Sequence, residues 1–176
     1  MSYIYHLAPQ DLRGTKLYPL NKLKTVFPEL YEQHAQKYSW RKETMQGHIP
    51  ILNCLWNDVL HFSPVHPSLV KSALQGAGFK VGQWRVFKFD ARKLEPEKTV
   101  LYRYLHQDRR DKYTLPGNFE PFSTEQLSEI NDLSQRTKSY YRETFREGKR
   151  PLMFVGVPHV LYKGSLDISE VEILEL

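Results

Sequence analysis

The chain has 176 residues, and its 25 Lys and Arg side chains outnumber 20 Asp and Glu side chains, so it is mildly basic. Its 40% hydrophobic and 26% charged residues exclude a disordered or low-complexity protein. The single cysteine excludes an internal disulfide framework, and no apolar run reaches the ~20 residues of a membrane helix. Because the N-terminus also lacks a secretory signal pattern, we expect one cytoplasmic domain over residues 1–176 without a membrane partner.

Hydrophobic periodicity predicts strands and helices along the whole chain. In chain order we expect a strand at 3–8, helices from about Asn21 and from Pro28, one or two strands within 49–64, and a helix at 67–78. Further along we expect strands at 83–90 and 99–105, a polar loop at 106–122, a helix at 124–148, and strands at 152–156, 159–164 and 171–176. Few strands are joined by helices, which favours an α+β fold with a split or strongly bent, mainly antiparallel sheet and flanking helices.

Three helix ends have a physical basis in the sequence. Pro28 suits a first helical position, where the N–H that proline lacks has no partner in the helix. Gly76 or Gly78 is expected to end the helix that begins at residue 67, because glycine readily adopts the left-handed conformation of a C-terminal cap. Ser123 opens a Ser-x-x-Gln capping box for the last long helix, and Gly148 stops that helix.

The last long helix carries a basic face. Lys138, Arg142 and Arg146 follow one another at intervals of four residues, with Lys149 and Arg150 just beyond. Such a face can follow the phosphates of DNA or RNA, and neighbouring aromatic side chains can stack on bases. The alternative is an ordinary amphipathic helix whose solvated side is basic.

Other polar residues give weaker signals. The seven histidines match no zinc-ligand spacing, so we expect no metal. Cys54 lies in an apolar run and is expected to be an unreactive core thiol. Glu170 and Glu172 would share one face of a strand, where paired carboxylates can serve acid–base chemistry. An edge strand protected by acidic side chains would show the same pattern.

Three segments carry a family pattern: YHLAPQDL near the N-terminus, WNDVLHFSPVHPSLV in the middle, and PHVLYKGSLDISEVEIL near the C-terminus. Together they resemble ADP-ribosyltransferase-like domains, most nearly the DNA-modifying toxins of that class. His6 takes the place of the family's histidine at the end of the first strand, and Ser63 lies in the matching middle segment. Val65 stands where the family has an arginine, and His159 stands where it has its catalytic glutamate.

The resemblance implies a split-sheet cleft that holds NAD⁺ between its halves. In that cleft His6 would bond to the nicotinamide-side ribose, either of two tyrosines would stack on a ring, and His66 or Arg103 would contact phosphate. The expected cofactor-binding residues are His6, Ser63, His66, Tyr102, Arg103 and Tyr104.

The resemblance also implies transfer of ADP-ribose from NAD⁺ to a nucleobase or a protein side chain, with release of nicotinamide. The base would be His159 or, in its place, Glu170 or Glu172. The basic helix face, formed by Lys138, Arg142, Arg146, Lys149 and Arg150, would hold a DNA or RNA substrate. The competing hypothesis is a catalytically silent domain of the same architecture that binds nucleic acid or a protein partner.

Overall fold

The computed structural model describes residues 2–38, 45–103 and 116–176, in which the two larger sheets are antiparallel. The first sheet contains, in spatial order, β1 (Tyr3–Leu7), β6 (Arg85–Asp90) and β11 (Glu172–Glu175). The second contains β5 (Leu60–Phe62), β9 (His159–Tyr162), β7 (Thr99–Tyr102) and β8 (Phe119–Pro121). Short ladders pair β2 (Lys16–Leu17) with β10 (Leu166–Asp167), and β3 (His48–Ile49) with β4 (Cys54–Leu55).

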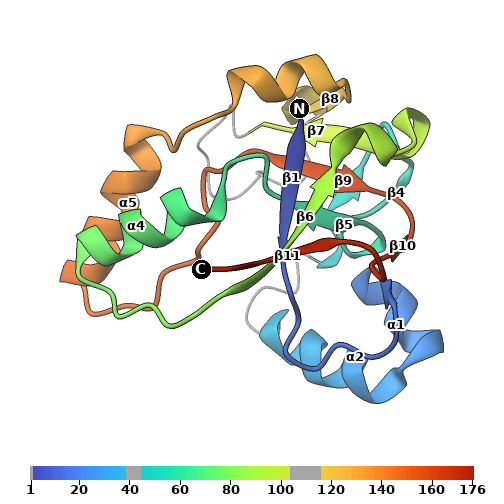
Figure 1. Cartoon of the computed structure of the whole chain (residues 1–176), viewed down its shortest axis with the longest axis horizontal. Helices are drawn as coiled ribbons and strands as arrows, with labels where there is room; N and C mark the ends of the chain where they lie inside the picture. Colours follow the sequence, from blue (N-terminus) through green and yellow to red (C-terminus); the bar gives the residue numbers. More distant parts are fainter. Residues whose placement is uncertain (1, 39–44, 104–115) are drawn as a thin grey trace.

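Helices flank these sheets. The α-helices of the described residues are α1 (Leu20–Val26), α2 (Pro28–Ala35), α4 (Pro67–Ala77) and α5 (Gln135–Arg146). The 3₁₀ helices are η1 (Gln36–Tyr38), η2 (Trp56–Asp58), η3 (Ala91–Lys93), η4 (Pro96–Lys98), η5 (Pro116–Asn118) and η6 (Thr124–Glu129). α4 and α5 pack together on one side of the sheets, and α1 and α2 pack together on another (Figure 1). None of the helices in this part of the chain has the length and hydrophobicity to span a bilayer. The predicted α+β class is confirmed.

The two larger sheets meet at one point, between β1 and β5. Tyr5 and Ser63 form an isolated antiparallel bridge there, with N–H···O distances of 2.9 Å and 2.8 Å in the two directions. Because this bridge replaces a full ladder, the sheet is split between β1 and β5, as the sequence predicts. We call this junction the β1–β5 seam.

Alternation along the strands sends side chains into two separate cores. Ile4, Phe62 and Phe87 belong to the larger core, which also receives Val70 of α4 and Tyr141 of α5. The other face of the four-stranded sheet packs into a second core. Its members are Ile49, Leu52, Cys54, Trp56, Val59, Val100, Tyr102, Phe119 and Leu161. The candidate functional residues lie at the edge of this second core.

Local signals set several element boundaries as expected. Pro28 is the first residue of α2, and Gly78 ends α4 in the left-handed conformation with φ of 111°. The Cβ of a larger residue at Gly78 would lie 2.6 Å from a ring carbon of Phe145, so that exposed ring would have to move. Cys54 is buried, and burial raises the pKa of its thiol to about 11, which makes it unreactive.

Three predicted elements are wrong. The helix expected at 124–148 is divided into η6, which carries the capping box of Ser123, and α5, which Ser134 caps. The chain leaves the helical path between them, and Leu127, Ile130 and Leu133 are all buried in the larger core. Residues 152–156 form turns instead of a strand, with φ of 73° at Gly156. The described end of the expected loop at 106–122 contains strand β8.

Candidate functional site

One cross-strand row carries several of the predicted site residues. Residues opposite one another in antiparallel strands share a face of the sheet. The pairs along this row are Glu172 with Lys88, Lys88 with Tyr5, Tyr5 with Ser63, and His159 with Tyr102. Phe62 of β5 pairs with Val160 of β9. If this antiparallel register continues by one residue, Ser63 lies opposite His159. The row therefore runs from β11 across the β1–β5 seam to β7.

The predicted glutamates do not lie with His159. Glu172 is four strand spacings away along the row, or roughly 19 Å at the usual distance between strands. Its carboxylate is 2.8 Å from the ammonium of Lys88 and is mostly exposed. Glu170 precedes β11 and is exposed. The carboxylate of Glu172 is therefore remote from a sugar that contacts His159.

His6 and His159 instead both lie beside a third histidine, His61: His159 faces its ring, whereas His6 contacts its main-chain carbonyl and packs its own ring against Phe62. The Nδ1 of His6 lies 2.8 Å from the carbonyl oxygen of His61, and the Nε2 of His61 lies 2.9 Å from the carbonyl oxygen of Trp56. The rings of His61 and His159 are 6.2 Å apart between centroids. We call His6, His61 and His159 the histidine cluster.

Aromatic rings enclose one side of the histidine cluster. The centroid of the Trp56 ring lies 4.8 Å from that of His61, 5.2 Å from that of Tyr102 and 6.3 Å from that of His159. The Nδ1 atom of His159 is buried and makes no well-aligned hydrogen bond in the described part of the chain, although the ring interacts with the backbone of Val157. The cluster therefore combines ring surfaces with polar ring atoms.

Burial keeps the cluster neutral. It lowers the pKa of His61 to about 3 and that of His159 to about 4, and it also lowers the pKa of His6. The proximity of His159 to His61 adds to the lowering of the pKa of His61, because two positive rings would repel each other. All three residues keep intermediate exposure, so they line an edge of the core. At neutral pH these rings offer hydrogen bonds and ring surface, but no fixed charge.

The backbone also determines which nitrogen of each ring is protonated. A carbonyl oxygen only accepts hydrogen bonds, so the ring nitrogen facing it must carry the proton. We therefore expect neutral His6 to be protonated on Nδ1 and neutral His61 on Nε2. Two-bond ¹H–¹⁵N correlation spectra at pH 7 measure this directly, and the opposite tautomer at either residue would contradict the geometry. The exposed His48 provides a reference spectrum within the same chain.

The remaining predicted cofactor residues are held by other contacts. The Nδ1 of His66 accepts a hydrogen bond from the backbone N–H of Ser68 at 3.2 Å and caps α4, while its ring packs against Tyr5 at 4.9 Å. Burial, and secondarily Lys88, lowers the pKa of His66. The guanidinium of Arg103 lies between the carboxylates of Glu120 at 3.1 Å and Glu129 at 3.8 Å. Tyr104 lies outside the described residues.

The predicted basic face is partly neutralised and is shorter than expected. Lys138 pairs with Asp132 at 3.3 Å, and Lys149 pairs with Glu147 at 2.8 Å. α5 ends at Arg146, so Lys149 and Arg150 follow the helix and do not extend its face. Arg142, Arg146 and Arg150 make no ion pair with any residue that the structure describes.

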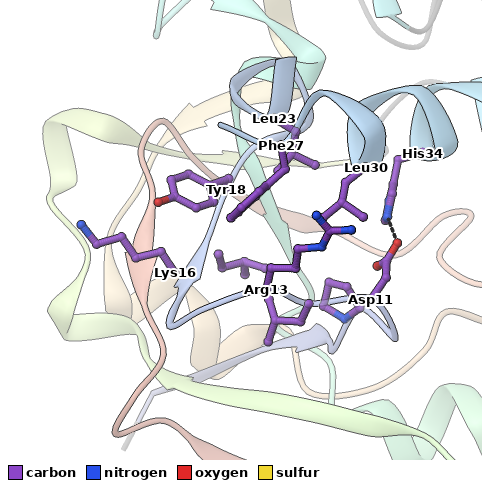
Figure 2. Close-up of a pocket in the computed structure, with 11 residues that line it drawn as sticks. Asp11, Arg13, Lys16, Tyr18, Leu23, Phe27, Leu30 and His34 are labelled. Atoms are coloured by element: carbon purple, nitrogen blue, oxygen red, sulfur yellow. Dashed lines mark hydrogen bonds and ion pairs between the residues drawn. The ribbon is translucent and has the colours of Figure 1, made fainter. Parts of the chain in front are cut away.

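A separate small pocket lies between the turn after β1 and helices α1 and α2 (Figure 2). Arg13, Lys16 and Phe27 contribute to its lining, and His34 contacts Asp11 at 2.8 Å on one side of it. Its volume of about 40 Å³ admits a few water molecules, which is far less than a nucleotide needs. The histidine cluster is the better candidate for nucleotide chemistry.

Sequence reasoning missed Trp56 and considered His61 only as a metal ligand, which the spacing of the histidines does not support. Both residues lie in an apolar run, which is equally typical of core residues. Within the described residues no group of three or more His, Cys, Asp or Glu side chains is arranged to hold a metal ion.

Comparison of the chain with protein-family models, curated proteins and solved structures finds no match.

Proposed function

We propose that the histidine cluster beside the β1–β5 seam binds NAD⁺ or a related nucleotide, as in an ADP-ribosyltransferase-like protein. The observation that carries this proposal is the proximity of the His61 and His159 rings to the ring of Trp56, with His6 bound to the main-chain carbonyl of His61. Neutral imidazoles can bond to ribose hydroxyls or a carboxamide, and an aromatic surface suits a planar base. The buried Nδ1 of His159, which makes no well-aligned hydrogen bond within the described residues, is a further polar atom at this site.

Transfer of ADP-ribose to DNA or RNA is the chemical step that we propose for this site. The bond between nicotinamide and ribose breaks, positive charge develops on the ribose, and a nucleophile on the acceptor forms the new glycosidic bond. His159 would take the proton of that nucleophile. A neutral ring with a pKa of about 4 is a weak base and gives no electrostatic stabilisation to the developing charge. We therefore expect slow release of nicotinamide.

The second candidate function is a catalytically silent domain that binds nucleic acid or a protein partner. It is favoured by the remote position of Glu172 and by the guanidinium groups of Arg146 and Arg150, which make no ion pair with the described residues. In this case the histidine cluster is a structural part of the second core. The two candidates differ in whether a nucleotide stabilises the folded chain.

A thermal shift assay with NAD⁺ distinguishes them. A specific ligand at 100 times its dissociation constant should stabilise the folded chain by about 2.7 kcal/mol. We expect this shift in the wild-type chain. The shift should be lost in His159→Leu, which replaces the imidazole with an apolar side chain at this partly buried position. The exposed His48→Ala variant is the control and should keep the shift.

The nucleotide proposal is contradicted if NAD⁺, ADP-ribose and nicotinamide mononucleotide all leave the melting temperature unchanged. A shift with a single-stranded oligonucleotide alone would support the silent domain. A shift with NAD⁺ but no release of nicotinamide over a day would retain nucleotide binding and exclude the transfer step.

A further inference from the structure

A groove of about 340 Å³ lies between α4 and α5, which run side by side in Figure 1. Its lining includes Leu69, Ser72, Ala73 and Gly76 of α4 and Lys138 and Arg142 of α5. The α4 residues recur at intervals of three and four, so they form one face of that helix. The small side chains of Ser72, Ala73 and Gly76 leave the space that the cations of α5 border.

The groove has an excess of positive charge. The ammonium of Lys138 is shared with Asp132, which also lines the groove. The guanidinium of Arg142 contacts only the hydroxyl of Ser139, at 3.0 Å, among the residues that the structure describes. Two cations thus face one carboxylate, and Arg142 keeps donors for an anion.

The size and lining of the groove indicate a small ligand. Sites for small molecules usually have volumes of about 300–1,000 Å³, and the groove falls within that range. Among the described residues, none that lines the groove has an aromatic ring, which disfavours single-stranded nucleic acid, because such strands stack their bases on aromatic side chains. The guanidinium fork matches the oxygen atoms of a phosphate group.

We propose that the groove binds a small phosphate monoester. Arg142 and Lys138 hold the phosphate, and Leu69, which is 37% exposed, contacts the carbon part of the ligand. Ala73 and Gly76 have to stay small for the ligand to enter. This site is separate from the histidine cluster and does not depend on the function proposed there.

Two variants test the charge and the space of the groove independently. Arg142→Gln removes a cation that makes no ion pair with the described residues and stands at an exposed helical position. Gly76→Leu fills the groove without a change in charge, and a Cβ at Gly76 meets no atom within 4 Å. Leucine is also a better helix former than glycine, so this variant should fold. Arg146→Gln, one turn further along α5 and outside the lining, is the matched control.

Titration of the full ¹⁵N-labelled chain with glucose 6-phosphate and with glucose is the test. We expect glucose 6-phosphate to shift the amide signals of Ser72, Ala73 and Gly76, and glucose to leave them unchanged. Arg142→Gln should weaken binding by about tenfold or more, because it removes charge-assisted hydrogen bonds. Gly76→Leu should abolish binding at an unchanged or higher melting temperature, and Arg146→Gln should bind within about twofold of wild type.

The proposal is overturned if glucose binds equally well, if Arg142→Gln binds as tightly as wild type, or if no groove amide shifts. It is also overturned if a single-stranded oligonucleotide shifts the groove amides while glucose 6-phosphate does not. None of these outcomes affects the NAD⁺ proposal, which is measured by the separate thermal shift of His159→Leu.

Discussion

Replacing Trp56 with alanine should lower the free energy of unfolding by about 3–5 kcal/mol. Trp56 is 7% exposed, and its ring contacts His61, Tyr102 and His159. Removal of the ring leaves a cavity in the second core that these rigid neighbours cannot fill. Urea denaturation followed by far-UV circular dichroism measures the change, and an unaltered m-value would show that the same surface is still buried.

Trp84→Ala is the matched control for this prediction. Trp84 has the same side chain but keeps intermediate exposure, and it packs against the larger core. Trp84→Ala should lower the free energy of unfolding by a clearly smaller amount, because less of the apolar surface of Trp84 is removed from water when the chain folds. An equal or smaller loss for Trp56→Ala would show that the ring does not support the second core. The same variant should also raise the pKa values of His61 and His159 toward 6.5, since it exposes their rings.

Acid should destabilise the chain well above the pH at which carboxylates titrate. Burial lowers the pKa of His61 to about 3 and of His159 to about 4, whereas an unfolded chain protonates histidine near pH 6.5. Between those values the unfolded state binds more protons, so stability falls as pH decreases. As the pH falls from 6 to 4.5, His61 and His159 should each lower the free energy of unfolding by about 1.4 kcal/mol per pH unit. His6 and His66, whose pKa values are also lowered, act in the same direction.

The carboxylates act in a lower pH window. The pKa of Asp90 is lowered to about 2 by its bonds to Arg92, and that of Asp132 is lowered by the N–H of Leu133 and by Lys138. Stability from such groups is present above their unfolded pKa near 4 and is lost only below it. Glu95 and Glu125, whose pKa values are lowered from 4.5, begin to lose their contribution between pH 5 and pH 4.5, so the slope above pH 5 reports the histidines.

Urea denaturation at pH 7, 6, 5 and 4.5 measures this slope. His159→Phe replaces the titrating ring with an aromatic ring of similar shape. It should reduce the slope of the unfolding free energy against pH by the part that His159 contributes. His48→Ala, at an exposed position, should leave the slope unchanged. A flat profile from pH 7 to pH 4.5 in the wild-type chain would contradict the burial of the histidine cluster.

Several features of this protein can be predicted from neighbouring residues in the sequence alone. Pro28 begins a helix because its missing N–H has no partner at that position, and Gly78 ends one because only glycine adopts a φ of 111° without strain. Alternating patterns located β1 and β6, because each strand has one face in the larger core. These signals depend on neighbours within a few residues.

The tertiary structure alone decided the candidate sites. Nothing local in the sequence indicates that the carbonyl oxygen of His61 accepts a hydrogen bond from His6, or that the ring of His61 faces that of His159. Both contacts join strands that are far apart in the chain. The register of β11 on β6 placed Glu172 beside Lys88 and away from His159. The break before α5 likewise follows from the burial of Leu127, Ile130 and Leu133, although a capping box and a helical pattern precede it. Sequence thus determined the elements and their buried faces, whereas strand register and core packing determined which side chains meet.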